Sequence, residues 1–146
     1  MGTQQILMIV LSVIVVGAAV AVGITMFNTQ SQNSQRQAIV GDLQNYAAHA
    51  LSYYKTPASM GGGGYSYGAN LAAAQAGVGV SLGMTTGALT NLNGTYTLTF
   101  TDADNIVITG VGKEIGRDGT NGVKAVININ GKAGTATISV AAGDTN

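Results

Sequence analysis

One long apolar run lies near the N-terminal end of this chain. From Ile6 to Phe27 the sequence reads ILMIVLSVIVVGAAVAVGITMF, 22 residues in which Ser12 and Thr25 are the only polar members. No charged side chain occurs before Arg36. As a helix rising about 1.5 Å per residue, the run would span roughly 33 Å, which matches a bilayer core of about 30 Å. It therefore predicts a helix able to cross a membrane.

Two other kinds of segment carry an apolar run of this sort, a secretory signal peptide and a buried core helix. A signal peptide begins with a positively charged region and has an apolar stretch of about 7–15 residues, whereas Met1–Gln5 is uncharged and the run is longer. A core helix that is apolar on all sides needs a large protein to bury it, and the rest of this chain is too small. We therefore expect residues 6–27 to be buried in a membrane or between subunits.

The helical pattern continues past Phe27 but changes character. Residues 28–37, NTQSQNSQRQ, are polar and contain neither Pro nor Gly. They are followed by an apolar stripe of Ile39, Leu43, Tyr46, Ala47, Ala50, Tyr53 and Tyr54. The opposite, polar face carries Gln37, Asp42, Gln44, Asn45 and Ser52. Pro57 ends the pattern because the residue before a proline disfavours the α region, so we expect one helix from about residue 3 to about residue 55.

Residues 56–94 are interpreted as a glycine-rich connection between this helix and a β-rich region. Gly61–Gly64 is a run of four glycines. Asn70–Ala76, NLAAAQA, predicts a short helix with Asn70 as its N-cap. Residues 78–92 show no clear period.

From Thr95 onward the hydrophobic period changes to two, which indicates β-strands. Four strands are expected, near residues 95–101, 106–111, 123–130 and 135–140. Asn130-Gly131 is the strongest hairpin signal, because both residues tolerate positive φ. The predicted fold class is α+β: a long N-terminal α-helix, apolar in its first half and amphipathic in its second, packs on a C-terminal antiparallel β-sheet of about four strands.

Composition argues against several classes of function. Charged residues make up 8% of the chain and the formal net charge is zero. Binding to nucleic acid needs clustered Lys and Arg to neutralise phosphates, so we predict no nucleic-acid contact. The chain has no cysteine, which excludes a disulfide framework and a cysteine nucleophile. We identify no catalytic constellation and predict no enzyme activity, no cofactor and no metal site.

Five short signals suggest chemistry but favour a structural role. His49 is the only histidine and lies inside the long helix. Asp102 and Asp104 supply two carboxylates, whereas calcium takes about six to eight oxygen ligands. Asn93-Gly94-Thr95 fits the N-glycosylation pattern and equally a hairpin turn. Gly61–Gly64 lacks the Lys and Ser/Thr of a phosphate-binding loop. Arg117-Asp118-Gly119 is a three-residue match to an integrin-binding tripeptide and is better explained as a turn.

An apolar N-terminal helix without a positive flank, followed by an amphipathic helix and a small antiparallel sheet, resembles the type IV pilin and pseudopilin superfamily. The resemblance is specific only over residues 1–55. It implies that prepilin peptidase removes a short basic leader and leaves Met1 as the mature terminus, whose amine is a site of methylation. In most of the family the position of Gln5 is a glutamate that pairs with the N-terminal amine of a neighbouring subunit. Gln5 keeps an acceptor carbonyl but carries no charge.

The resemblance also implies a route of assembly. The helix would lie first in the inner membrane and then, through the pilus assembly machinery, in the core of a helical filament of identical subunits. The residues expected to make the assembly contacts are Gln5, Ile6, Leu7, Ile9, Val10, Leu11, Val13, Ile14, Val15 and Val16. Gly17 and Gly23 are expected to be weak points of the helix. The corresponding domains are residues 1–27 (filament-core helix), 28–55 (amphipathic continuation), 56–94 (connecting loop) and 95–146 (sheet-bearing head).

The function predicted from the sequence is therefore a structural subunit of an extracellular type IV pilus-like filament at the cell surface. A pseudopilin of a type II secretion-like system is an alternative that the sequence scarcely separates from it. In a second alternative, a membrane-tethered binding module, the helix is only an anchor and the head carries a recognition groove. An archaeal pilin is a third, although the stripe from Ile39 to Tyr54 favours the helix-on-sheet form of bacterial pilins.

Overall fold

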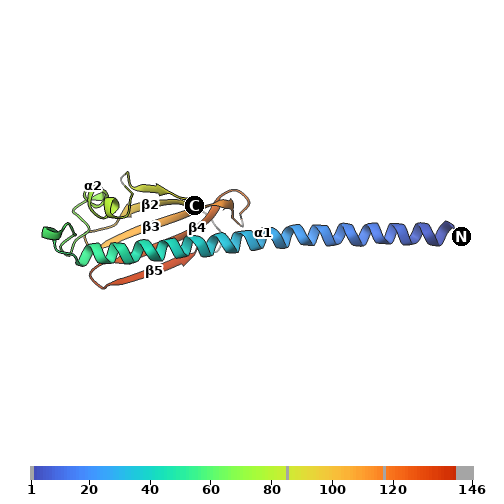
Figure 1. The fold of residues 1–146 in the computed structure, drawn as a ribbon, viewed down its shortest axis with the longest axis horizontal. Coiled ribbons are helices and arrows are strands. Elements are labelled where there is room, and N and C mark those ends of the chain that lie inside the picture. Colours follow the sequence, from blue (N-terminus) through green and yellow to red (C-terminus); the bar gives the residue numbers. More distant parts are fainter. Residues whose placement is uncertain (1, 85, 117, 141–146) are drawn as a thin grey trace.

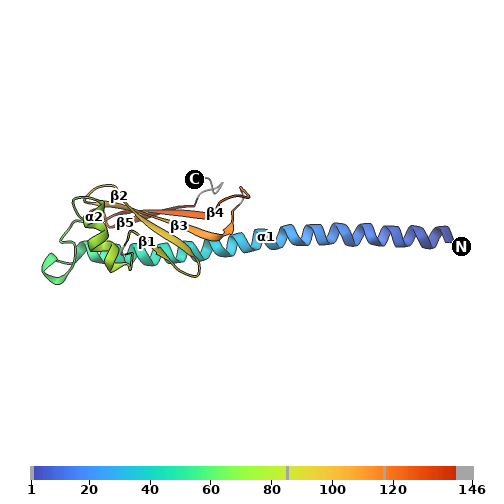
Figure 2. The same cartoon turned by 90° about the horizontal axis from the view of Figure 1, so that it is seen from above.

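The computed structural model describes residues 2–84, 86–116 and 118–140. One long helix, α1 (Gly2–Lys55), contributes its second half to a head that also contains the sheet (Figure 1). The first half of α1 extends away from this head. In both views no other described segment lies beside it (Figures 1 and 2).

Helix α1 is continuous over 54 residues, which confirms the single helix predicted for about residues 3–55. Its amphipathic half packs one face on the sheet. The buried positions are Ile39, Leu43, Ala47, Ala50 and Tyr54. They recur every three or four residues, so the predicted apolar stripe is confirmed.

The glycine run after α1 caps the C-terminal end of the helix. The last carbonyl groups of a helix have no partner within it. Here the carbonyl of Tyr53 accepts the N–H of Gly63 at 2.8 Å, and the carbonyl of Tyr54 accepts the N–H of Tyr65 at 2.9 Å. A Cβ atom on Gly63 would clash with the backbone of Ser66. The run is therefore folded back on the helix, because only glycine allows so close an approach.

The sheet has five strands in sequential order, each antiparallel to its neighbour. They are β1 (Ala88–Thr90), β2 (Gly94–Phe100), β3 (Asn105–Ile115), β4 (Gly122–Asn130) and β5 (Thr135–Val140). The four predicted strands are confirmed as β2 to β5. The sequence does not predict β1, because three residues with one half-buried side chain, Leu89, are too few to show a period.

Strand β3 is longer than the predicted strand, which ended near Val111. It continues to Ile115, where it pairs with Gly122 after an irregularity in the register with β4. A bulge of this kind interrupts the alternation of inward and outward side chains. The extension therefore carries no signal with a period of two.

The core of the head lies between α1 and one face of the sheet, as predicted. Alternate residues of β2, β3 and β4 point toward the helix. On the sheet side the core consists of Tyr96, Leu98, Ile106, Ile108, Val123, Ala125, Ile127 and Ile129. All of these are at most 2% exposed, so the second half of α1 is fixed firmly to the sheet.

Short helices between α1 and β1 close one end of this core. α2 (Leu71–Ala74) begins at Asn70, whose Oδ1 accepts the N–H of Ala73 at 2.9 Å, which confirms the predicted N-cap. A π-helical turn, η2 (Gln75–Gly79), follows it, and a 3-10 turn, η1 (Ala58–Met60), precedes it. The buried apolar residues that follow α2 are Val78, Leu82 and Met84.

The hairpin between β4 and β5 is confirmed, but its turn is longer than the two-residue turn that Asn130-Gly131 suggests. Asn130 pairs with Thr135, so the four residues 131–134 form the loop. Positive φ occurs at Gly134 (66°) and not at Asn130. Gly131 lies against the ring of Tyr54, where a Cβ atom has no room. Packing, and not turn geometry, therefore requires glycine at this position.

Candidate functional site

The candidate functional site is the apolar segment, residues 6–27 of α1. It is long and apolar enough to cross a membrane, and none of its most apolar stretch is buried within the described protein. The exposed fractions of the large apolar side chains predicted to make assembly contacts run from 49% (Val10) to 70% (Leu7). Soluble monomers rarely expose a contiguous apolar surface of this extent, so it marks a site of interaction.

The predicted assembly residues surround the helix and do not form a single face. Ile6, Leu7, Ile9, Val10, Leu11, Val13, Ile14, Val15 and Val16 occupy successive turns, and all are exposed. Gln5 is exposed beside them, whereas Met1 lies outside the described residues. A single flat partner would leave the far side of such a helix in water. Full burial therefore requires lipid or several neighbouring helices.

Hydroxyl groups in and just beyond the apolar segment are satisfied by the helix itself. Ser12 Oγ donates to the carbonyl of Ile9 at 2.8 Å, and Thr25 Oγ1 donates to the carbonyl of Val22 at 2.8 Å. Thr29 Oγ1 donates to the carbonyl of Thr25 at 2.9 Å. Because a hydroxyl transferred from water without a partner costs free energy, these bonds suit a dry environment. In the sequence, Ser12 and Thr25 stand out only as the two polar members of the apolar run. Ser and Thr hydroxyls commonly donate to a carbonyl three or four residues earlier in a helix, so these bonds could have been predicted.

Gly17 and Gly23 lie within unbroken helix. A Cβ atom at either position would meet no atom within 4 Å, apart from the helix's own nearby backbone. Glycine in a helix interior costs about 1 kcal/mol relative to alanine, which is the reason for expecting the helix to be weak at these two positions. Because the helix is intact here, that weakness stays a prediction for the assembled state. Their lack of side chains would also allow a neighbouring helix to approach closely.

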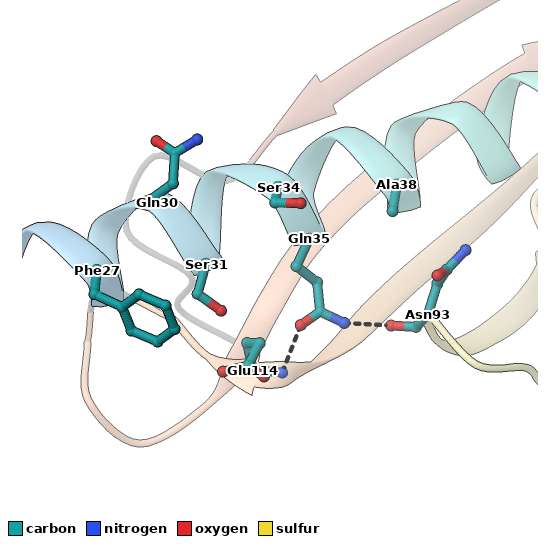
Figure 3. Close-up of a pocket in the computed structure, with 8 residues that line it drawn as sticks. All are labelled: Phe27, Gln30, Ser31, Ser34, Gln35, Ala38, Asn93 and Glu114. Carbon is teal, nitrogen blue, oxygen red and sulfur yellow. Dashed lines mark hydrogen bonds between the residues drawn. The ribbon is translucent and has the colours of Figure 1, made fainter.

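A clamp of side-chain amides fixes the direction in which the apolar segment leaves the head (Figure 3). Gln35 Nε2 donates to the carbonyl of Asn93 at 2.6 Å, and Gln35 Oε1 accepts the N–H of Glu114 at 2.8 Å. Gln32 Nε2 donates to the carbonyl of Ile115 at 3.0 Å. The clamp therefore joins α1 to the β1–β2 turn and to the end of β3. Sequence periodicity does not reveal it, because periodicity detects apolar faces and these are isolated polar contacts.

A shallow groove of about 440 Å³ lies beside the clamp, where the apolar segment meets the head (Figure 3). It is lined by Phe27, Gln30, Ser31, Ser34, Gln35, Ala38, Asn93 and Glu114. Among the described residues that line it, Glu114 alone has an ionisable side chain, and His49 is exposed elsewhere on α1. Among the described residues no three His, Asp or Glu side chains gather as a metal site would require. The groove offers amide and hydroxyl groups, which suit hydrogen bonding.

The sequence predicts that Asp42 lies on the polar face of α1, opposite the apolar stripe. In the structure Asp42 is instead half-buried and hydrogen-bonded to residues of the sheet and of the β1–β2 turn. Its Oδ2 accepts hydrogen bonds from Tyr96 Oη (2.6 Å), Asn93 Nδ2 (2.8 Å) and Asn91 Nδ2 (2.9 Å). Burial alone would raise the pKa of Asp42, but these three bonds outweigh it and hold the pKa below its usual 3.8. The amide of Asn93, in the candidate N-glycosylation pattern, is thus engaged within the head.

Asp42→Ala is expected to destabilise the head by about 1–3 kcal/mol, because three donors lose their common acceptor. Denaturant unfolding of the full chain in detergent micelles measures this change, and exposed Asn45→Ala on the same helix is the control. The pKa of Asp42 is lowered on folding, so its contribution is present above the unfolded-state pKa and is lost as pH falls through the folded-state pKa. The destabilisation should therefore shrink in acid, and a constant difference would contradict the assigned role.

The remaining acidic candidates belong to turns. Asp104 Oδ1 accepts a hydrogen bond from Tyr54 Oη at 2.6 Å, which raises the pKa of Tyr54 to about 12. The two carboxylate oxygens of Asp102 accept from Asn105 Nδ2 at 2.8 and 2.9 Å. Both aspartates thus order the β2–β3 turn. In the Arg117-Asp118-Gly119 match, Arg117 lies outside the described residues.

Comparisons of this chain with protein-family models, with curated proteins and with solved structures found no match. The fold and the apolar segment therefore carry the functional argument. They define an α+β protein whose head is joined, through one continuous helix, to an exposed helix able to enter a membrane.

Proposed function

We propose that this protein is a structural subunit of an extracellular filament of the type IV pilus kind, which polymerises through its apolar segment. The observation that carries the proposal is that one unbroken helix has an apolar cylinder at one end and lies in the core of the head at the other. The apolar surface demands burial, and the continuous helix gives every subunit the same relation between head and segment. Identical subunits can then repeat with one geometry.

The apolar segment fits two environments in turn. In the inner membrane its backbone groups would be satisfied within the helix, as a bilayer requires. In a filament the same surface would be buried by the apolar segments of several other copies. Dispersion contacts between Leu, Ile and Val would replace contacts with lipid, while Gly17 and Gly23 would allow close packing. The subunit could therefore pass from the membrane into the filament without any change in the surface of its apolar segment.

The rigid junction favours a filament over a membrane-tethered binding module. A tether that only anchors a head usually includes a flexible linker, which lets the head search for its partner. Here Gln32 and Gln35 clamp the helix to the sheet at the point where it leaves the head. A fixed direction is useful when heads must be placed regularly around a filament axis.

Electron microscopy of material sheared from the surface of cells that make this protein tests the proposal. We expect filaments whose main component, by mass spectrometry, is this chain. If sheared material contains no such filaments and the protein stays monomeric in the membrane fraction, the tethered-module alternative is correct. Filaments that are confined to the periplasm would instead identify a pseudopilin.

Gln5 offers a specific test of the contacts that set subunit register. We expect its carbonyl to accept a hydrogen bond from the N-terminal region of a neighbour, worth about 0.5–1.5 kcal/mol. Gln5→Leu should then raise the protein concentration needed for assembly, whereas Gln5→Glu should assemble at least as well as wild type. Sedimentation of polymer after dilution from detergent measures both. Normal assembly of the leucine variant would remove any special role for Gln5.

A further inference from the structure

The two edges of the sheet are unequal. An edge strand presents unpaired backbone N–H and C=O groups, which native proteins protect by short length, charge, proline or a bulge. β1, at one edge, has three residues and offers little backbone. β5, at the other, has six residues in unbroken register with β4 (Figure 1). Within the described residues, β5 is therefore the long open edge.

Strand β5 carries none of the usual protection. Its sequence, TATISV, contains no charge and no proline, and its pairing with β4 contains no bulge. Four of its six residues are β-branched, the type that strands favour. Only Ile138 is half-buried, and Val140 is 41% exposed. An edge of this composition is suited to accept another strand.

We propose that β5 is an interaction surface for a second copy of this chain, through antiparallel pairing of the two β5 strands about a two-fold axis at Ile138. A second copy is the occupant because the strand is complementary to itself. It has no charge that would repel its counterpart. The same six residues can supply both sides of the contact, as a two-fold interface requires.

The register follows from the two faces of β5. Ala136, Ile138 and Val140 pair with inward-facing residues of β4, so they lie on the helix side, and Thr135, Thr137 and Ser139 lie on the other. Like faces stay together only when the two-fold axis passes through a residue and not between two. With the axis at Ile138, this residue faces its own copy, Ala136 faces Val140, and Thr137 faces Ser139. Apolar side chains then meet apolar ones, and hydroxyls meet hydroxyls.

This pairing places the two long helices in opposite directions. α1 runs along the strands in both views, so a two-fold axis across β5 reverses it in the second copy (Figures 1 and 2). The contact is therefore unsuited to neighbours within one filament, whose helices run in parallel. On the proposed function, β5 instead joins heads of two antiparallel filaments side by side. The apolar segment and β5 are then independent surfaces, one for polymerisation and one for bundling.

Introduced cysteines test the pairing cleanly, because the chain has none. Residues directly opposed in antiparallel strands have Cα atoms about 4.5–5.5 Å apart, within the range of about 4.4–6.8 Å for a disulfide. Ile138→Cys in the full chain, oxidised mildly in detergent micelles, should give a disulfide-linked dimer. Thr135→Cys is the matched control, because its two copies would lie about 20 Å apart along the strands and should stay unlinked.

A second arm avoids the half-buried position. A mixture of Thr137→Cys and Ser139→Cys proteins, both exposed on β5, should crosslink to each other far more than either does alone. Adding Ser139→Lys to the Ile138→Cys chain should abolish its dimer, because two cations would lie in the pairing edge. Equal crosslinking of Thr135→Cys and Ile138→Cys, or the absence of dimer in both the Ile138 and the mixed arms, would overturn the proposal.

Electron microscopy separates this proposal from the proposed function. Ser139→Lys in the otherwise natural chain should leave filaments intact but disperse side-by-side bundles into single filaments. Val15→Asp should remove filaments while the Ile138→Cys dimer still forms in micelles. Bundles that persist in Ser139→Lys count against β5. If the natural chain forms no filaments while the Ile138→Cys variant still crosslinks, the result counts only against the proposed function.

Discussion

Val15→Asp is expected to abolish polymerisation of the full chain. Val15 lies near the middle of the apolar segment with an exposed fraction of 59%, and no described residue could pair with an introduced carboxylate. Burying an unpaired ion costs several kcal/mol, and every subunit in the polymer would bear that cost. Ultracentrifugation after removal of detergent should leave the variant in the supernatant, or in amorphous aggregate, under conditions that pellet wild-type filaments.

Two controls isolate the effect of burial. Val15→Leu keeps the position apolar and should polymerise normally. Asn45→Asp adds the same charge to an exposed position of α1 within the head and should also polymerise. Filament formation by Val15→Asp at the wild-type concentration would show that this part of the helix is not buried, and it would exclude the proposed mechanism.

A chain that begins at Asn28 is expected to be a soluble, folded monomer. Every residue of the described hydrophobic core lies at or after Ile39, so the truncation removes apolar surface without removing the core. The clamp residues Gln32 and Gln35 are also retained. Since burial of apolar surface is the main drive for association, its removal should eliminate polymerisation. Size-exclusion chromatography with light scattering measures the mass, and circular dichroism confirms the mixed helix and strand content.

The truncated chain also tests how strongly the heads associate. β5 is intact in it, so weak dimers at high concentration are compatible with the edge pairing, whereas filaments are not. Filaments formed by residues 28–146 would show that contacts between heads dominate assembly. An unfolded product would show that the apolar segment stabilises the head.

Most of the fold follows from the hydrophobic period of the sequence. The helix and the four longer strands are long enough for the pattern to repeat, and the same pattern identifies which faces pack together. The pattern does not predict β1, because β1 is only three residues long. It does not predict the extension of β3, because a bulge breaks the alternation. The helical period places Asp42 on the polar face of α1, but it does not reveal that the Asp42 carboxylate accepts a hydrogen bond from the Tyr96 hydroxyl of the sheet.

Some features of the candidate site can likewise be predicted from the sequence, and others cannot. Composition alone identifies the apolar segment, because a run of 22 residues without charge can be recognised without knowledge of the three-dimensional structure. The clamp at Gln35 and the helix cap formed by Gly63 depend on backbone atoms that are distant in the sequence. No local sequence pattern therefore predicts them. The roles of Gln5, Gly17 and Gly23 depend on a neighbouring subunit, and they stay predictions for the assembled state.

Helical reconstruction of filaments by electron cryomicroscopy would show directly what surrounds the apolar segment after assembly. We predict that residues 6–27 of many copies pack against one another around the filament axis, with the heads outside and no lipid or water separating the helices. A reconstruction in which the heads form the axis and the apolar segments project outward, or are absent from the polymer, would exclude polymerisation through the apolar segment.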